Sequence, residues 1–125
     1  MSHFSILPTR ITDAETLRLS LMDLGLTVKT HAAVRGDRCQ QIDAEVVAVL
    51  PGDYDLGWTR NAEGSFDLVG DLWGVARKHN PTDLINRINS RYALHKAMEQ
   101  VRLSGHTTVS QQTTDVGTVR VVISR

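Results

Sequence analysis

The sequence predicts an α+β fold: a single domain over residues 1–125, in which two helices cover one face of a mostly antiparallel sheet of about five to seven strands. Three observations predict this class. Two segments carry apolar residues at helical spacing, several short segments alternate apolar and polar residues as strands do, and Gly and Pro residues separate them. The expected order of elements along the chain is β-α-β-β-β-β-α-β-β.

The first helix is expected to begin at Thr12, because Thr12 and Glu15 have the spacing of a capping box. Gly25 is suited to end it in the left-handed conformation. The apolar stripe predicted to face the sheet consists of Leu17, Leu21 and Leu24, widened by Leu19 and Met22. A short edge strand, Phe4–Leu7, is expected before this helix, and a second strand, Thr27–Val34, after it.

Three further strands are expected in the middle of the chain, at Gln41–Leu50, Tyr54–Arg60 and Ser65–Asp71. The second half of the first strand is apolar on both faces, which predicts that both faces are covered there. The other two strands form a predicted hairpin around the loop Ala62–Gly64, with Gly64 in the left-handed conformation.

The pattern of apolar residues selects one register for this hairpin. A three-residue loop keeps the apolar side chains on one face, whereas a loop of two or four residues mixes polar and apolar side chains on both faces, which a half-buried sheet resists. The selected register gives the pairs Trp58 with Leu68, Arg60 with Phe66, and Asp55 with Asp71.

A long second helix is expected from Pro81 to about Ser104, with Asn80 as its N-cap and Pro81 at the first helical position. Its apolar stripe changes side: the first half presents Leu84, Ile85, Ile88 and Tyr92, and the second half presents Leu94, Met98 and Val101. Either the helix bends between Tyr92 and His95, or its second half contacts a different surface, such as another subunit. A hairpin of the strands Thr107–Gln111 and Thr118–Ser124 is expected to follow.

Charge and composition exclude several classes of function. The 14 Lys and Arg residues balance the 14 Asp and Glu residues, so the chain lacks the basic excess that binding to nucleic acid or to an anionic membrane requires. No apolar run approaches the roughly 20 residues of a membrane-spanning helix, so no membrane insertion is expected. The lone Cys39 cannot form an internal disulfide, which makes the cytoplasm the default compartment.

No catalytic or cofactor site is expected either. The sequence contains neither the glycine-rich dinucleotide fingerprint nor the phosphate-binding P-loop, and its five His residues lack the spacing of a metal site. No Ser, His and Asp residues have the sequence context of a hydrolase triad. We therefore favour a non-enzymatic protein without a cofactor, and a small enzyme stays open as the less favoured alternative.

The acidic residues Asp53, Asp55 and Asp71 are candidate binding residues, because like charges directly opposite one another in a sheet require solvent or a counter-cation. Three interpretations stay open. The carboxylates lie on a solvated face with an Arg nearby, which is the favoured interpretation, or Asp55 and Asp71 hold a hard cation, or they accept a basic side chain from a partner.

Arg35, Arg38 and Trp73 complete the candidate binding surface. The two guanidinium groups of the turn Arg35–Arg38 either bind a carboxylate or phosphate group or are simply solvated. Trp58 is expected in the core of the sheet. For Trp73, which lies outside the strands, the core is favoured over a partner surface, although Trp is enriched among interface hot spots.

Segments spread in order over nearly the whole chain resemble those of a known family. They are Met1-Ser2-His3-Phe4-Ser5, Thr12-Asp13-Ala14-Glu15, Asp23-Leu24-Gly25-Leu26, Val34-Arg35-Gly36, Tyr54-Asp55-Leu56-Gly57-Trp58, Ser65-Phe66-Asp67-Leu68-Val69-Gly70-Asp71, Leu72-Trp73-Gly74-Val75-Ala76 and Ile88-Asn89-Ser90-Arg91-Tyr92-Ala93. In them the chain resembles the hypothetical chloroplast reading frame thirty-five family, found in algal plastids, cyanobacteria and other bacteria. The resemblance implies a soluble, phototroph-associated protein of the cytoplasm or plastid stroma, and it transfers no catalytic residue because the family's function is unknown.

Two functions are therefore expected as alternatives. The first is a non-enzymatic binding or assembly protein, an accessory factor that contacts another protein in a photosynthetic or related redox complex. The second is a regulatory domain that binds a small ligand or a cation. A homo-oligomer formed through the stripe of Leu94, Met98 and Val101 is compatible with the second function.

Overall fold

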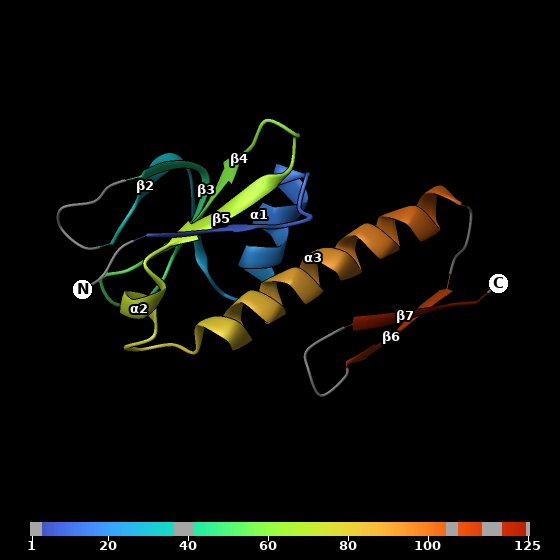
Figure 1. Ribbon diagram of the computed structural model, residues 1–125. Coiled ribbons are helices and arrows are strands. Elements are labelled where there is room, and N and C mark those ends of the chain that lie inside the picture. The colour runs from blue at the N-terminus through green and yellow to red at the C-terminus, as the bar shows by residue number, and fades with distance from the viewer. Residues whose placement is uncertain (1–3, 37–41, 105–107, 114–118, 125) are drawn as a thin grey trace. The chain divides into compact units, whose positions relative to one another are not determined.

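The computed structural model describes residues 4–36, 42–104, 108–113 and 119–124, and it confirms the α+β class (Figure 1). The chain divides into two compact units, residues 1–81 and 82–125. The first unit contains a five-stranded sheet, and the second contains a two-stranded sheet.

The sheet of the first unit is antiparallel throughout, with the strand order β1-β5-β4-β3-β2. Its strands are β1 (Ser5–Pro8), β2 (Thr27–Val34), β3 (Ile42–Val49), β4 (Leu56–Arg60) and β5 (Phe66–Gly70). The helices of this unit are α1 (Ala14–Asp23) and α2 (Leu72–Val75). Strand β1 lies at an edge of the sheet, as predicted, whereas the single turn of α2 was not predicted.

Helix α1 packs against β2 and β3, and its N-cap is Asp13 instead of the predicted Thr12 (Figure 1). The Asp13 Oδ1 atom accepts hydrogen bonds from the backbone N–H groups of Glu15, at 3.0 Å, and Thr16, at 3.2 Å, while Oδ2 accepts one from the Thr16 hydroxyl at 2.9 Å. A carboxylate offers two acceptor oxygens where a hydroxyl offers one, which favours Asp13 as the cap. Gly25, with φ of 77°, follows the end of the helix as predicted.

The buried stripe of α1 is narrower than predicted. Leu17 and Leu21 are fully buried, but Leu19 and Met22 are 44% and 56% exposed, so the predicted widening of the stripe is wrong. Thr16 and Ser20 occupy the inward positions instead. The Ser20 hydroxyl donates to the Thr16 carbonyl at 2.7 Å, so this buried polar group is satisfied within the helix.

The β4–β5 hairpin has the predicted register, which includes the pairs Trp58 with Leu68 and Arg60 with Phe66. The backbone N–H of Asn61 donates to the Ser65 carbonyl at 2.8 Å and closes the three-residue loop, in which Gly64 has φ of 87°. Trp58 is 2% exposed and lies in the core, as predicted. The alternation of apolar residues and one glycine were therefore sufficient to predict this hairpin.

The β2–β3 hairpin folds back over the sheet. Thr27, at the start of β2, pairs with Val49, whereas Arg35, directly after the end of β2, donates from its side chain to the Leu50 carbonyl at 2.8 Å. A straight strand of this length would separate its ends by about 23 Å, so β2 has to curl for both ends to reach the same part of β3. His31, in the middle of β2, has φ of 49°, a value that few non-glycine residues adopt.

The concave side of this curl holds a core cluster of Val34, Ala44, Val47 and Val69, against which Phe4, Ala32, Ile42 and Val49 pack. Gly57 of β4 lies against this cluster. A Cβ atom at Gly57 would overlap Val34 Cγ2 and would lie 3.0 Å from the Ala44 Cβ atom. The strand can approach the folded hairpin this closely because residue 57 has no side chain. The burial of Val46, Val47 and Ala48 confirms that the second half of β3 is covered on both faces.

The second unit consists of α3 (Pro81–Leu103) and the antiparallel pair β6 (Thr108–Thr113) and β7 (Val119–Ser124). Helix α3 begins at Pro81, as predicted, and continues as one helix to Leu103. Within the stripe of its second half, Leu94 and Val101 are buried and Met98 is 47% exposed. A subunit interface through this stripe stays a prediction.

Replacing Gly57 by Ala is expected to lower the free energy of unfolding by roughly 2 kcal/mol, because the added methyl group strikes Val34 inside a packed cluster. Urea unfolding of the wild-type protein and the variant measures this difference. In a Val34→Ala background the same substitution should cost much less, because the opposing methyl group is gone. An equal cost in both backgrounds would contradict the close contact.

Candidate functional site

Arg35 and Asp55 form a clamp between the end of β2 and the segment before β4. The Arg35 Nη2 atom donates to Asp55 Oδ1 at 2.8 Å, and Nε lies 3.0 Å from both carboxylate oxygens. The backbone takes part as well: the Arg35 N–H donates to the carboxylate atom Asp55 Oδ2 at 2.9 Å, and the Asp55 N–H donates to the Arg35 carbonyl at 3.0 Å. The remaining guanidinium N–H groups reach the carbonyls of Gly52, at 2.7 Å, and Leu50, at 2.8 Å.

The clamp fixes the charge of Arg35. The hydrogen bond to the Asp55 carboxylate raises the pKa of Arg35 above its ordinary value, burial opposes this shift, and the negative charges of Asp55 and Asp53 reinforce it. The carboxylate of Asp55 is 2% exposed, and the Leu50 N–H also donates to it at 3.3 Å. Its negative charge is therefore balanced inside the chain.

The favoured interpretation of a solvated acidic face is wrong for Asp55 and Asp71, because both side chains are buried. The β4–β5 ladder ends at the pair of Leu56 with Gly70, so the two acids occupy the next positions on adjacent strands. An Arg does lie nearby, as expected, and it binds Asp55. Asp53, by contrast, is exposed.

Asp71 is the N-cap of α2. Its Oδ1 atom accepts a hydrogen bond from the Gly74 N–H at 3.0 Å, while no described residue donates to its buried Oδ2 atom. This hydrogen bond stabilises the change of direction from the end of β5 to the single helical turn that carries Trp73. The sequence missed this cap because α2 is too short to show a helical period.

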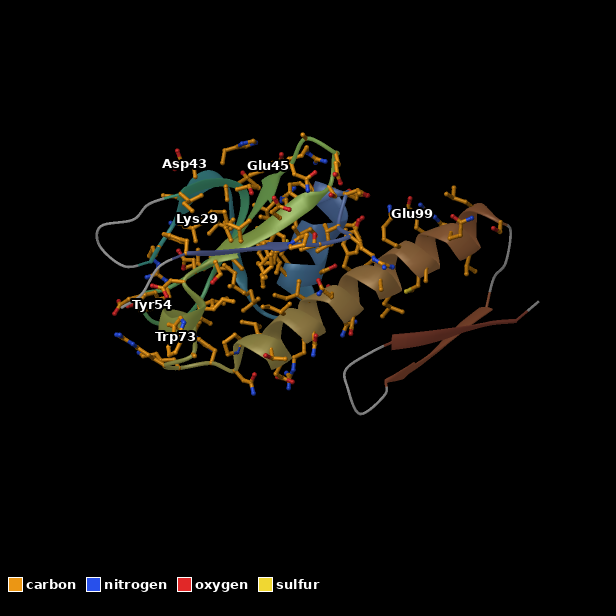
Figure 2. All side chains as sticks on the ribbon, in the orientation of Figure 1. Lys29, Asp43, Glu45, Tyr54, Trp73 and Glu99 are labelled. Atoms are coloured by element: carbon orange, nitrogen blue, oxygen red, sulfur yellow. The ribbon has the colours of Figure 1, made fainter. Side chains whose placement is uncertain are left out.

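Trp73 is 73% exposed, so its favoured placement in the core is wrong. The α2 turn buries Gly74 and Val75 and directs Trp73 outward. Figure 2 shows Trp73 and Tyr54 near the same end of the first unit. A Cβ atom at Gly74 would overlap the ring of Tyr54, which shows that this ring lies against the backbone of α2.

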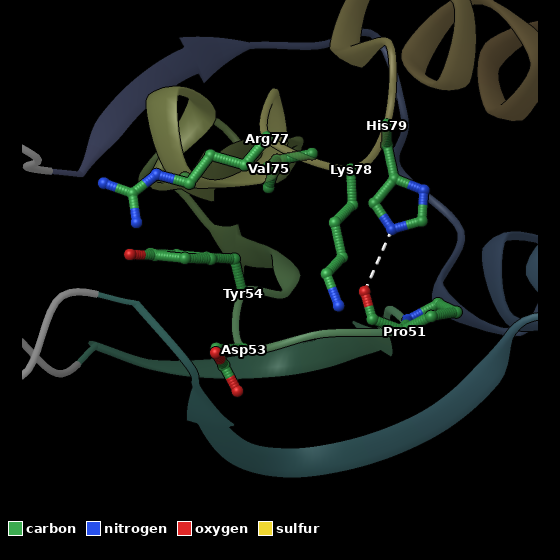
Figure 3. A pocket seen from close by; sticks show the side chains of 8 residues that line it. Pro51, Asp53, Tyr54, Val75, Arg77, Lys78 and His79 are labelled. Carbon is green, nitrogen blue, oxygen red and sulfur yellow. Dashed lines mark hydrogen bonds between the residues drawn. The ribbon is translucent and has the colours of Figure 1, made fainter.

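A pocket of about 240 Å³ lies beside α2 (Figure 3). Its lining residues come from two segments: Pro51, Asp53 and Tyr54 before β4, and Gly74, Val75, Arg77, Lys78 and His79 in and after α2. The Arg77 guanidinium carbon lies 5.7 Å from the centroid of the Tyr54 ring. The His79 Nε2 atom lies 3.0 Å from the Pro51 carbonyl, and because a carbonyl only accepts, this nitrogen is the donor.

The structure brings only part of the predicted surface together. Arg35, Asp53 and Asp55 lie around the segment that precedes β4, and Asp71 and Trp73 flank the start of α2. Arg38 lies outside the described residues. The basic run after α2 was visible in the sequence, but its position opposite Tyr54 depends on the tertiary fold, and the sequence carried no signal for that pairing.

Two general properties of the site follow from the described part of the chain. There, no group of three or more His, Cys, Asp and Glu side chains is arranged to hold a metal ion. None of the described helices is both long enough and apolar enough to cross a membrane.

Comparison with known proteins gives a family but no activity. Residues 20–122 match the model of a family described as "Protein of unknown function (DUF1257)". Two relatives named "Uncharacterized protein ycf35" match all of this chain and 98% of their own length: the protein of Guillardia theta is 28% identical and that of Pyropia yezoensis 22% identical. No solved structure matches significantly.

Replacing Arg35 by Ala is expected to lower the free energy of unfolding by roughly 2–3 kcal/mol, because it leaves the Asp55 carboxylate buried without its counter-charge. The expected loss lies below that for a fully buried pair, since the Arg35 side chain is itself 44% exposed. Urea unfolding near neutral pH measures the effect.

The matched control for this prediction is Arg87→Ala, which removes an ion pair with Asp83 in which both side chains are more than half exposed. It should cost about 0.3–0.5 kcal/mol, the usual contribution of an exposed helical pair. Equal losses in the two variants would contradict a structural role for the clamp.

Proposed function

Because the chain belongs to the DUF1257 family of proteins of unknown function, its role has to be argued from its surface, and we propose that it is a non-enzymatic binding protein that docks onto another protein through Trp73. The observation that carries the proposal is the 73% exposure of this Trp side chain. An exposed Trp is unusual because its large apolar surface remains hydrated, and burying that surface against a partner supplies binding free energy.

The way in which Trp73 is held supports the proposal. Its neighbours on either side are fixed: the Asp71 carboxylate caps the turn, and Gly74 lies against the Tyr54 ring. A side chain on a fixed backbone loses less conformational entropy on binding than one on a flexible loop. This arrangement favours a docking residue over a chance exposure.

The relatives support a partner in a phototroph. Both are named ycf35, and they come from the algae Guillardia theta and Pyropia yezoensis. This agrees with the resemblance to a chloroplast reading frame in the sequence. The proposed role is therefore that of an accessory factor for a photosynthetic or related redox complex, acting in the cytoplasm or the plastid stroma.

A second candidate function is a regulatory domain that binds a small ligand. The observation that favours it is the pocket beside α2, in which an aromatic ring faces a run of basic residues. A homodimer through α3 belongs to the same alternative, and the exposed side chains of Met98 and Leu103 are compatible with such an interface.

Replacing Trp73 by Ala is expected to weaken association with the partner at least about tenfold, as at an interface hot spot, while changing the free energy of unfolding by no more than about 0.5 kcal/mol. The partner is identified by quantitative affinity purification of the tagged full chain from a phototrophic host. Its affinity for the wild-type protein and the variant is then measured with purified components.

The matched control is Met22→Ala on α1, which removes another exposed apolar side chain, 56% exposed. A protein counts as the partner only if Met22→Ala retains it and Trp73→Ala releases it. Recovery of the same proteins at the same yield with both variants would contradict docking through Trp73.

A further inference from the structure

The pocket beside α2 concentrates positive charge. Arg77, Lys78 and His79 are consecutive in the chain, and all three line it. In the part of the chain that the structure describes, neither Arg77 nor Lys78 forms an ion pair. Neighbouring cations without counter-charges repel each other, and a bound anion relieves that repulsion.

Asp53, the acidic residue among those that line the pocket, forms no ion pair with Arg77 or Lys78 within the described residues. In the view of Figure 3 the Tyr54 ring lies between the Asp53 carboxylate and the Arg77 guanidinium. The negative charge of Asp53 also contributes to the raised pKa of the Arg35 guanidinium. The side of the pocket formed by residues 77–79 is therefore positively charged.

The backbone that carries the basic side chains is also held in position. The backbone N–H groups of Arg77 and Lys78 donate to the carbonyls of Gly74 and Val75, at 3.1 and 3.2 Å, which fixes the turn. The His79 ring donates to the Pro51 carbonyl across the pocket, as the dashed line in Figure 3 shows. A backbone that is fixed before a ligand arrives lowers the entropic cost of binding.

The opposite wall is apolar and rigid. The Tyr54 ring lies against Gly74, where any side chain would overlap it, and the Arg77 guanidinium lies over the same ring. Val75 is 1% exposed and completes this wall. The pocket thus has a cationic side, formed by residues 77–79, and an aromatic side.

We propose that this pocket binds a small organic phosphate monoester, with its phosphate group at Arg77 and Lys78 and its organic part against the Tyr54 ring. A phosphate monoester carries up to two negative charges and three acceptor oxygens at neutral pH, which match the two cations Arg77 and Lys78 better than a single carboxylate does. The volume of about 240 Å³ is several times that of one water in the liquid, about 30 Å³, and leaves room for an organic group of modest size. This site goes beyond protein docking and does not depend on Trp73.

The test titrates the full chain with phenyl phosphate and, separately, with inorganic phosphate at low ionic strength. Binding of each probe is measured from the amide chemical shifts in NMR spectra. We expect saturable binding of phenyl phosphate at millimolar concentration or below, with amide shifts confined to residues 52–54 and 74–79. Inorganic phosphate should bind at least about tenfold more weakly, because it lacks the ring that contacts Tyr54. Absence of saturable binding, or equal affinity for both probes, would overturn the assignment.

Variants assign the two sides of the pocket. Arg77→Gln and Lys78→Gln should each weaken the binding of phenyl phosphate at least about tenfold, which is the contribution of one charge-assisted hydrogen bond. The control Lys29→Gln, which removes the same charge from β2, should leave the binding unchanged. Tyr54→Ala should weaken the binding of phenyl phosphate but not that of inorganic phosphate. If Lys29→Gln weakens binding as much as Lys78→Gln, the attraction is a general charge effect and the site is overturned.

Discussion

The interaction on which the rest of the first unit depends is the clamp between Arg35 and Asp55. It joins residues 20 positions apart through one backbone hydrogen bond, one hydrogen bond from the Arg35 N–H to the Asp55 carboxylate, and a side-chain ion pair. It ties the turn end of the curled β2–β3 hairpin to the segment that precedes β4. Burying a carboxylate is costly unless its oxygens are fully satisfied, so Asp55 is compatible with only one position of the β2 end. The clamp therefore selects the folded-back form of the β2–β3 hairpin over a flat sheet.

The clamp also builds the candidate site, because the segment that it holds carries Tyr54. Arg35 binds the carbonyls of Leu50 and Gly52, and so fixes the backbone that leads into β4. Tyr54 then rests on Gly74, whose N–H is bound by Asp71. The pocket thus lies between two segments that are each held by a buried carboxylate, which explains how exposed loops keep a defined shape.

The sequence was informative where the signal is local. Gly64 and the alternation of apolar residues determine the β4–β5 register, and the strand Thr27–Val34 was predicted with its observed bounds. The sequence was not sufficient where a structural feature depends on contacts between residues that are far apart in the chain. Nothing local marks the curl at His31, and charge alone argued for solvated carboxylates, because burial of Asp55 requires Arg35 to arrive from a distant strand. The outward position of Trp73 was missed because it follows from the Asp71 cap and the short α2 turn.

These corrections reverse the electrostatic character of this end of the unit. In the sequence, Asp53, Asp55 and Asp71 suggest an acidic edge that attracts cations. In the fold, Asp55 and Asp71 accept hydrogen bonds from backbone N–H groups and are removed from solvent, so they act as structural caps. The exposed groups beside them are Trp73, Arg77 and Lys78, with Asp53 as the carboxylate that stays in solvent. Most of the exposed groups at this surface are therefore aromatic or cationic, so a complementary ligand or partner carries apolar and anionic groups.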